Sequence, residues 1–323
     1  MCSFVSIPVL TDTELASQRL SEKLYRPFIQ RQVNLGRCVD KWTDREYLVS
    51  QVPADKPVVV HSSSSANLTF CPKNFTYRST TFADVIKLCS ESSPTQFTYL
   101  RSLRTAEEHS APGKSGRPEQ QPANVEADFP KVWEDVRLPD WIPVEKLFST
   151  VLRISSTKLN VWIHYDVMDN ALLQIVGRKE VFLFSPRDMD YMYLKGDKSE
   201  IVDLCNPDLK KFPLFANAVC YRSILAPGDL LYIPAFWFHS TTALSYSIGL
   251  NVFWKDVDPS LYDSKDTYGN KDLVAGANAL QDAERIVNKL HKLPEHHRDF
   301  YARRVVKQIR EQCFMDDIDR SSK

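Results

Sequence analysis

Two histidines and one aspartate in the second half of the chain have types and spacing that suit a metal site. His164 and Asp166 are separated by one residue, and His239 follows further along. Side chains at positions i and i+2 of a strand point to the same face, so His164 and Asp166 can converge on one ion. Two histidines and one carboxylate hold Fe(II) while leaving positions open for oxygen and a further ligand. Core histidines satisfied by hydrogen bonds are the alternative interpretation.

The His-x-Asp spacing alone is a weak signal, because composition produces it by chance. With 7 histidines and 41 acidic residues among 323, about one match to His-x-Asp/Glu is expected from composition. A second match, His297-Arg298-Asp299, falls in a segment that we expect to be helical. Positions i and i+2 of a helix diverge by roughly 200°, so this pair is predicted to be surface charge.

The region around the first match has the pattern of a β core. Short apolar runs alternate with turn signals such as Pro227-Gly228-Asp229. Many short strands at close intervals predict an antiparallel double-sheet barrel or jelly roll. His239 follows a buried strand and Pro234, which would place its imidazole in the barrel mouth. The predicted strands are residues 148–154, 159–163, 171–176, 180–184, 223–225, 230–233 and 245–254.

Helices and a polar loop are expected on either side of this core. Residues 105–130 are polar and broken by four prolines, which predicts a mobile surface loop. Two apolar stripes joined at Leu293-Pro294 predict a C-terminal αα-hairpin. We therefore expect one domain over residues 1–256 and a helical region over 257–323. The other predicted elements are helices at 11–25, 41–52 and 80–89, the last capped by Thr80 or Thr81, and a strand at 56–61.

Composition excludes several classes of protein. Hydrophobic residues make up 43% and charged residues 25%, as in globular proteins, and the formal net charge is zero. A strongly basic whole-chain footprint for nucleic acid is absent, although a local basic patch remains possible. The longest apolar runs are far shorter than a membrane span. The seven scattered cysteines contain no Cys-x-x-Cys pair, and we expect no signal peptide, so a reducing compartment, cytoplasm or nucleus, is predicted.

The segment from Phe148 to Trp254 resembles the JmjC-type, cupin-fold Fe(II)/2-oxoglutarate oxygenases. The motifs that carry the resemblance are His164-Tyr-Asp166, Asn170, Gly177-Arg-Lys-Glu-Val-Phe-Leu-Phe-Ser-Pro186 and the Pro-Gly-Asp…Ile-Pro…His239 segment. Further segments between residues 70 and 310 resemble the branch of the family that hydroxylates a wyosine-type base of tRNA. They include Lys73-Asn-Phe-Thr-Tyr-Arg78, Tyr193-Leu-Lys-Gly196 and Thr267-Tyr-Gly-Asn-Lys-Asp272. The fold implied is a mainly β double-stranded β-helix with flanking helices.

The resemblance assigns roles to residues of this chain. It implies that His164, Asp166 and His239 bind Fe(II) and that Lys179 pairs with the distal carboxylate of 2-oxoglutarate. Tyr99 and Asn170 are implied as hydrogen-bond donors to the same cosubstrate. Without the resemblance, Lys179 would be a solvated strand residue, Tyr99 a core tyrosine and Asn170 a turn asparagine.

One position departs from the pattern of many JmjC enzymes. They have a threonine three residues before the first histidine, where its hydroxyl binds 2-oxoglutarate. Val161 occupies that position here and donates no hydrogen bond. The replacement donor would have to come from Tyr99 or elsewhere.

The resemblance also implies substrate and partners. The substrate would be the wyosine-type base beside the anticodon of phenylalanine tRNA, with O₂ as co-reactant and a homodimer formed through the C-terminal helices. Arg101 and Lys114 are candidates for phosphate contact, and Arg153 for an anionic group of the substrate. Gly113-Lys114-Ser115 lacks the first glycine and preceding strand of a P-loop. A basic run on the last helix (Arg303, Arg304, Lys307 and Arg310) is predicted to be solvated surface.

Two other functions compete with tRNA hydroxylation. A JmjC oxygenase could act on a protein side chain instead, with histone lysine demethylation a variant that lacks any accompanying reader or zinc domain. A non-catalytic cupin that only binds a ligand is the second competitor. The metal motif alone does not discriminate between the two oxygenase functions.

Overall fold

The computed structural model describes the chain except residues 1–2, 16–24, 71, 105–120, 205 and 315–323. The chain forms two compact units, Met1–Lys271 and Asp272–Lys323. The first unit therefore extends beyond the boundary at residue 256 that the sequence predicts. The physical reason is that residues 257–271 fold back onto the β core, where the backbone N–H of Val167 donates to the carbonyl of Gly269 at 3.0 Å. Tyr262 and Asp266 are buried in this segment.

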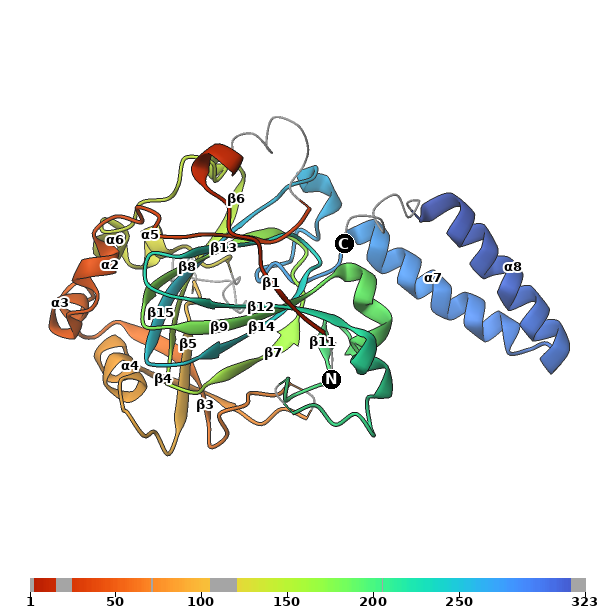
Figure 1. The fold of residues 1–323 in the computed structure, drawn as a ribbon, viewed down its shortest axis with the longest axis horizontal. Helices are drawn as coiled ribbons and strands as arrows, with labels where there is room; N and C mark the ends of the chain where they lie inside the picture. Colours follow the sequence, from red (N-terminus) through yellow and green to blue (C-terminus); the bar gives the residue numbers. More distant parts are fainter. Residues whose placement is uncertain (1–2, 16–24, 71, 105–120, 205, 315–323) are drawn as a thin grey trace, which may run out of the picture. The chain divides into compact units, whose positions relative to one another are not determined.

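Two sheets make up the first unit (Figure 1). The seven-stranded sheet has the order β1-β12-β9-β14-β7-β11-β10, and the eight-stranded sheet β2-β13-β8-β15-β6-β5-β3-β4. Pairing is antiparallel except between β1 and β12. The bounds in the first sheet are β1 Ser3–Ser6, β7 Asn160–His164, β9 Lys179–Phe184, β10 Leu194–Lys195, β11 Lys198–Ser199, β12 Val219–Leu225 and β14 Phe238–Ala243. In the second they are β2 Phe28–Gln30, β3 Pro57–Ser63, β4 Thr76–Thr81, β5 Phe97–Arg101, β6 Leu147–Ser155, β8 Asp169–Val176, β13 Leu230–Ile233 and β15 Ser247–Trp254.

The strand order is that of the predicted jelly roll. Successive strands from β6 to β9, and again from β12 to β15, alternate between the two sheets. Each connection therefore crosses from one sheet to the other, which winds the chain into a double-stranded β-helix. The predicted strands in 148–254 all exist, but β14, which carries His239, was not predicted as a strand.

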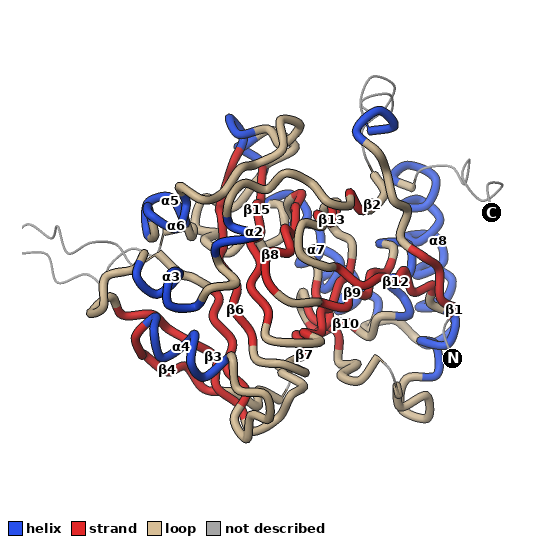
Figure 2. The backbone as a smooth tube through the Cα atoms, turned by 60° about the vertical axis from the view of Figure 1, so that its left-hand side comes forward, coloured by secondary structure: helices blue, strands red, loops and turns tan. Residues whose placement is uncertain are grey.

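Helices cover the outer side of the eight-stranded sheet (Figure 2). α4 (Phe82–Cys89) begins at Thr81, whose hydroxyl accepts from the Asp84 N–H as the sequence predicts, and buries Val85 and Ile86. The single helix predicted at 41–52 is instead two short ones, because the Asp44 carboxylate caps a new helix start. They are α2 (Cys38–Lys41) and α3 (Arg45–Ser50). Of the helix predicted at 11–25, residues 12–15 are helical, residue 25 is not helical, and residues 16–24 lie outside the described part.

The predicted mobile loop at 105–130 is wrong for its last ten residues, and residues 105–120 lie outside the described part. Gln121 bridges to Arg104, and two short helices follow, α5 (Val125–Asp128) and α6 (Pro130–Trp133). Asn124 caps the first through the Ala127 N–H, and Pro130 opens the second, where a missing N–H has no cost. Val125 and Phe129 are buried in the core, which offsets the polar composition. The 3₁₀ helices are η1 (Val144–Lys146), η2 (Pro186–Tyr191), η3 (Pro213–Asn217) and η4 (Pro259–Leu261).

The second unit is the predicted αα-hairpin. Its helices are α7 (Val274–Leu290) and α8 (Glu295–Cys313). Neither helix has a buried residue, and apolar side chains such as Leu280 and Val306 are more than half exposed. Within the described ranges, no helix has the length and apolar character that a membrane span requires.

Candidate active site

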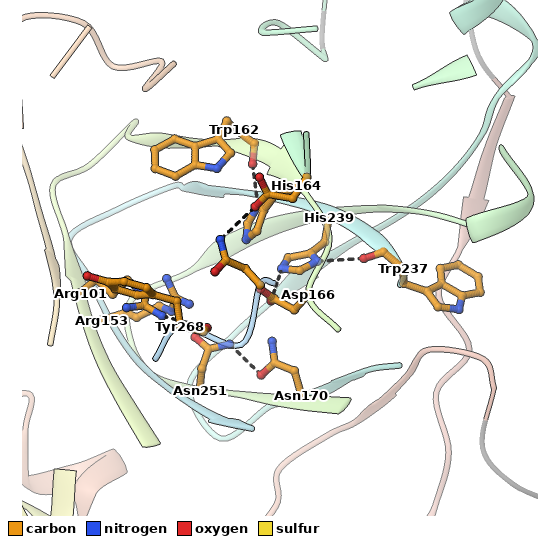
Figure 3. Close-up of polar contacts among 12 residues, drawn as sticks. Arg101, Arg153, Trp162, His164, Asp166, Asn170, Trp237, His239, Asn251 and Tyr268 are labelled. Atoms are coloured by element: carbon orange, nitrogen blue, oxygen red, sulfur yellow. Dashed lines mark hydrogen bonds and ion pairs between the residues drawn. The ribbon is translucent and has the colours of Figure 1, made fainter. Parts of the chain in front are cut away.

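The three predicted metal residues meet at one point of the barrel (Figure 3). His164 ends β7, and His239 lies directly opposite it on β14 in the strand register. One ligand atom from each of His164, Asp166 and His239 lies within 4.8 Å of the others. His239 Nε2 is 3.5 Å from Asp166 Oδ2, and the two imidazole ring centroids are 4.3 Å apart. The group has the geometry to hold one metal ion.

Hydrogen bonds fix both imidazoles in the form that a metal requires. His164 Nδ1 is 3.0 Å from the carbonyl of Trp162, and His239 Nδ1 is 3.0 Å from that of Trp237. Because a carbonyl only accepts, each Nδ1 carries the hydrogen and each Nε2 keeps its lone pair. Burial lowers the pKa of both histidines, so the rings are neutral at neutral pH.

The carboxylate completes this donor set. Asp166 Oδ2 is buried, and it has no hydrogen-bond partner among the described residues. Burial raises the pKa of Asp166. An unpartnered buried carboxylate oxygen is costly, and a cation beside the two Nε2 atoms would remove that cost. The three side chains therefore fit a divalent metal.

The neighbouring turn holds Asp166 in place. Asp166 lies beyond the end of β7, so the strand geometry predicted for the His-x-Asp pair stops at His164. Two hydrogen bonds tie this connection to the turn between β13 and β14. The Phe236 N–H donates to the Asp166 carbonyl at 2.8 Å, and the Ala235 N–H donates to Asp169 Oδ1 at 2.9 Å. Phe236 has a positive φ of 68°, which strains a residue with a side chain and gives the turn its shape.

A β-bulge in β7 orients further side chains towards the metal residues. His164 pairs with His239 and Val161 pairs with Thr241, so two residues between the pairs on β7 lie opposite one residue on β14. The extra residue breaks the alternation of faces, as bulges near active sites commonly do. Val161, Trp162 and His164 consequently all line one cavity of about 750 Å³, together with Asp166.

Lys179 is buried in the barrel interior, as the family resemblance implies. It begins β9, is 4% exposed, and has no acidic partner within the described ranges. Burial, and then the nearby Arg153, lower its pKa to about 7. The ammonium lies beside Gly249 on β15, where a Cβ would be in ordinary contact with Lys179 Nζ at 3.6 Å. The alternative of a solvated strand residue is therefore wrong.

Two arginines line the cavity next to each other. Arg101 on β5 and Arg153 on β6 are cross-strand partners, and neither has a carboxylate partner in the described part of the chain. Arg153 donates to the Tyr99 hydroxyl, and Arg101 donates to the carbonyl of Tyr268 at 3.3 Å. Burial, and then Arg153, lower the pKa of Arg101 to about 10. Lys114, the third predicted substrate residue, lies outside the described residues.

The positions of Arg101 and Arg153 define a candidate anion site. Arg101 Nη1 and Arg153 Nε are buried without hydrogen-bond partners in the described structure. Guanidinium groups left unpaired in this way favour a carboxylate or phosphate ligand. Because Arg101 lines the cavity, it is placed to contact an anionic group that enters the cavity.

Asn170 is hydrogen-bonded to Asn251, a residue that the sequence analysis did not identify as part of the site. Asn170 lies in β8, not in a turn, and is 1% exposed. Its Oδ1 accepts from Asn251 Nδ2 at 2.9 Å, whereas Asn170 Nδ2 has no partner among the described residues. A polar Asn251 inside the apolar run of β15 was the available signal in the sequence. Trp162 and Tyr268 are further cavity residues that the sequence analysis missed.

The second His-x-Asp match is surface charge, as predicted. Asp299 lies on α8 and pairs with Arg303 at 2.9 Å. Lys307 Nζ, in the basic run, lies 3.5 Å from Glu311 Oε1 on the same helix, and both side chains are exposed. The segment Gly113-Lys114-Ser115, which the sequence analysis rejects as a P-loop, lies outside the described residues.

One family model matches most of this chain. Residues 18–260 match a family described as a cupin-like domain. The chain belongs to this cupin-like family. The match spans the whole double-stranded β-helix and all three predicted metal residues, which confirms the family resemblance found in the sequence.

Relatives of this cupin-like chain are named as tRNA wybutosine-synthesizing proteins. A Danio rerio protein named tRNA wybutosine-synthesizing protein 5 is 42% identical over 321 residues, covering 96% of this chain and 94% of the relative. The Homo sapiens protein of the same name is 40% identical over 318 residues, covering 95% and 97%. A Neurospora crassa protein named tRNA wybutosine-synthesizing protein 4 is 34% identical over 88% of this chain and 23% of the relative. The chain belongs to the same family as the two proteins named tRNA wybutosine-synthesizing protein 5.

Proposed function

We propose that this cupin-like protein is an Fe(II)- and 2-oxoglutarate-dependent hydroxylase of a wyosine-type base beside the anticodon of phenylalanine tRNA. One observation carries the proposal: His164, Asp166 and His239 offer two free Nε2 atoms and one carboxylate oxygen without a hydrogen-bond partner among the described residues, all within 4.8 Å of one another, and His164 and Asp166 line the cavity. Two histidines and one carboxylate are the donor set of non-haem Fe(II) oxygenases. The names of the relatives supply the class of substrate.

Iron in this site would supply the chemistry by which O₂ and 2-oxoglutarate yield succinate, CO₂ and a hydroxylated C–H position. The protein holds the site in shape before any ligand binds. The carbonyls of Trp162 and Trp237 prevent rotation of the two imidazoles, and the turn at Phe236 fixes the backbone of Asp166. Such fixed orientation is what second-layer hydrogen bonds contribute to metal affinity.

Three residues would bind 2-oxoglutarate. Lys179 offers a buried cation to the distal carboxylate, and the ligand charge would raise its lowered pKa again. Asn170 Nδ2 offers an unused donor. The Tyr99 hydroxyl accepts from Arg153, which leaves its own hydrogen free to donate. Tyr99 thereby replaces the hydroxyl that is missing at Val161.

Arg101 and Arg153 would bind the carboxylate on the side chain of the base. A wyosine precursor that carries an aminocarboxypropyl chain brings one carboxylate into the cavity. Two adjacent guanidinium groups with unused N–H donors match a carboxylate in charge and in planar geometry. The predicted phosphate contact of Arg101 is therefore replaced in this proposal by a contact inside the cavity.

The test is mass spectrometry of nucleosides from modified tRNA. Phenylalanine tRNA that carries the unhydroxylated wyosine precursor is incubated with protein, Fe(II), 2-oxoglutarate and O₂. We expect a gain of one oxygen on that base, and no gain with His164→Ala. The matched control His297→Ala changes a histidine of the surface motif on α8 and should retain full activity.

The other outcomes separate the competing functions. No oxygen gain, with 2-oxoglutarate still consumed, would refute the tRNA substrate and favour a protein side chain. Neither gain nor consumption would refute the enzyme and favour a binding module.

We also propose a homodimer formed through α7 and α8, in a reducing compartment. Exposed apolar residues on both helices, including Leu280, Val287 and Ile309, are the surface that a second copy would cover. Sedimentation at micromolar concentration should give twice 37.1 kDa, and Leu280→Glu with Val287→Glu should give the monomer. The compartment is inferred from the seven scattered cysteines, which contain no Cys-x-x-Cys pair.

A further inference from the structure

Aromatic side chains line the cavity from the metal residues to its exposed edge. We define the aromatic wall as His61, Phe70, Tyr77 and Trp162, all of which border the cavity. The Trp162 ring centroid is 6.2 Å from that of His164 and 5.2 Å from that of Phe70. Phe70 and Tyr77 are 37% and 54% exposed, which is high for large aromatic residues. The wall therefore joins solvent to the metal site.

The aromatic wall is held rigid from behind. Phe75 is buried and lies parallel to Trp162, with an interplanar angle of 7° and centroids 5.5 Å apart. Phe75 also contacts Tyr77 edge-on at 5.8 Å and His61 at 4.9 Å. Burial lowers the pKa of His61 to about 4, so this ring is neutral and adds a flat surface instead of a charge. A surface fixed in this way loses little entropy when a ligand stacks on it.

Polar groups around the aromatic wall indicate what kind of ligand it takes. Lys73 Nζ lies 4.1 Å from the Tyr77 centroid, and Lys198 Nζ lies 4.6 Å from the Phe70 centroid. Lys198 Nζ is also ion-paired with Asp197 Oδ1, so among the described residues Lys73 supplies the uncompensated positive charge at the exposed aromatic residues. Trp162 Nε1 is buried without an acceptor among the described residues, although a buried indole N–H ordinarily has one. The wall therefore offers flat apolar area, one unused donor and adjacent positive charge.

We propose that the aromatic wall binds the target base of a single-stranded RNA segment by stacking. Trp162 Nε1 donates to an acceptor on the base edge, and Lys73 contacts a flanking phosphate. Unpaired bases are commonly bound by aromatic stacking combined with basic residues along the backbone. The inference rests on the proposed function, because it takes RNA as the substrate and names the surface that would hold its base.

The experiment measures affinity for two RNA hairpins by fluorescence anisotropy. Both carry the anticodon loop of phenylalanine tRNA, one with the target base and the other abasic at that position. We expect Tyr77→Ala and Phe70→Ala each to weaken binding of the intact hairpin about tenfold, the usual size for loss of one stacked aromatic residue. Binding of the abasic hairpin should change less than twofold. Tyr77→Phe keeps the ring and should bind like the unaltered protein.

Controls separate stacking from general damage. Phe4→Ala removes an exposed aromatic residue of β1 that does not border the cavity, and should leave both affinities unchanged. Lys73→Gln should weaken both hairpins equally and lower the slope of log affinity against log salt by about 1. Equal loss on both hairpins for Tyr77→Ala, or no loss on either, would overturn the inference.

The result is distinguishable from failure of the proposed function. Base-dependent binding without oxygen gain on the nucleoside would refute the hydroxylase and support the stacking surface. Oxygen gain with Tyr77→Ala and Phe70→Ala unaltered in affinity would support the hydroxylase and refute the stacking surface.

Discussion

Replacing Lys179 by methionine should stabilise the ligand-free protein and at the same time abolish binding of 2-oxoglutarate. The Lys179 ammonium is buried, with no acidic partner in the described part of the chain. Burial, and then Arg153, lower its pKa from 10.5 to about 7. Methionine has a similar length and no charge, so it fills the space without this penalty. The same charge is what the distal carboxylate of 2-oxoglutarate would bind.

The size of the stabilisation expected for Lys179→Met follows from the difference in the pKa of Lys179 between the folded and unfolded states. The folded state holds its proton less tightly, so the cost of burying Lys179 falls as pH rises from about 7 towards 10.5. One pKa unit corresponds to about 1.4 kcal/mol, which gives a cost of about 4 kcal/mol at pH 7 and about 2 kcal/mol at pH 9. The stability gap between Lys179→Met and the unaltered protein should shrink accordingly.

Urea unfolding of metal-free protein at the two pH values measures this gap. Calorimetric titration of Co(II)-loaded protein without oxygen measures 2-oxoglutarate affinity. Lys195→Met, which changes an exposed lysine of β10, is the matched control and should alter neither quantity. A Lys179→Met protein that is less stable than the unaltered protein at both pH values would refute the reasoning. So would a variant that keeps its affinity for 2-oxoglutarate.

Three further substitutions test the site and its scaffold. His164→Ala should weaken metal binding by at least about 100-fold in a chelator competition, whereas His297→Ala should not. Gly177→Ala should destabilise the fold by about 3 kcal/mol or more in urea unfolding, because φ is +71° and the new Cβ would lie 2.0 Å from the Tyr246 carbonyl. Gly196→Ala, with φ +65° and no atom within 4 Å, should cost only about 1 kcal/mol.

The sequence predicted the β core well where strands are apolar. Leu230–Ile233 was predicted to the residue, since its side chains are buried on both faces. β14 escaped prediction because Phe238–Ala243 contains serine and threonine residues that resemble a turn. Those polar side chains are satisfied inside the sheet, for instance by the bond from the Ser240 hydroxyl to the Val161 carbonyl at 2.7 Å. Tertiary partners of that kind leave no periodic signal.

The aromatic wall could not be predicted for a different reason. Its members come from β3, β4, β7 and the segment before β4, so only the strand register brings them together. The bulge in β7 changes which face Val161 and Trp162 occupy relative to His164. A bulge depends on the partner strand, and the sequence of one strand does not reveal it. The metal motif was visible because its chemistry is specific, whereas the surface beside it depends on geometry alone.

The charges inside the barrel link the ligands of the proposed reaction to one another. Burial, and then Arg153, lower the pKa of both Arg101 and Lys179, whereas Asp166 raises that of Arg101, so three cationic groups interact in one interior region. A dianionic cosubstrate bound at Lys179 reduces the repulsion that Arg101 and Arg153 feel. Because coupling between two binding sites is reciprocal, a carboxylate bound by the two arginines would in turn strengthen binding of 2-oxoglutarate. Substrate and cosubstrate should therefore bind with positive cooperativity, and Arg153→Met should abolish it.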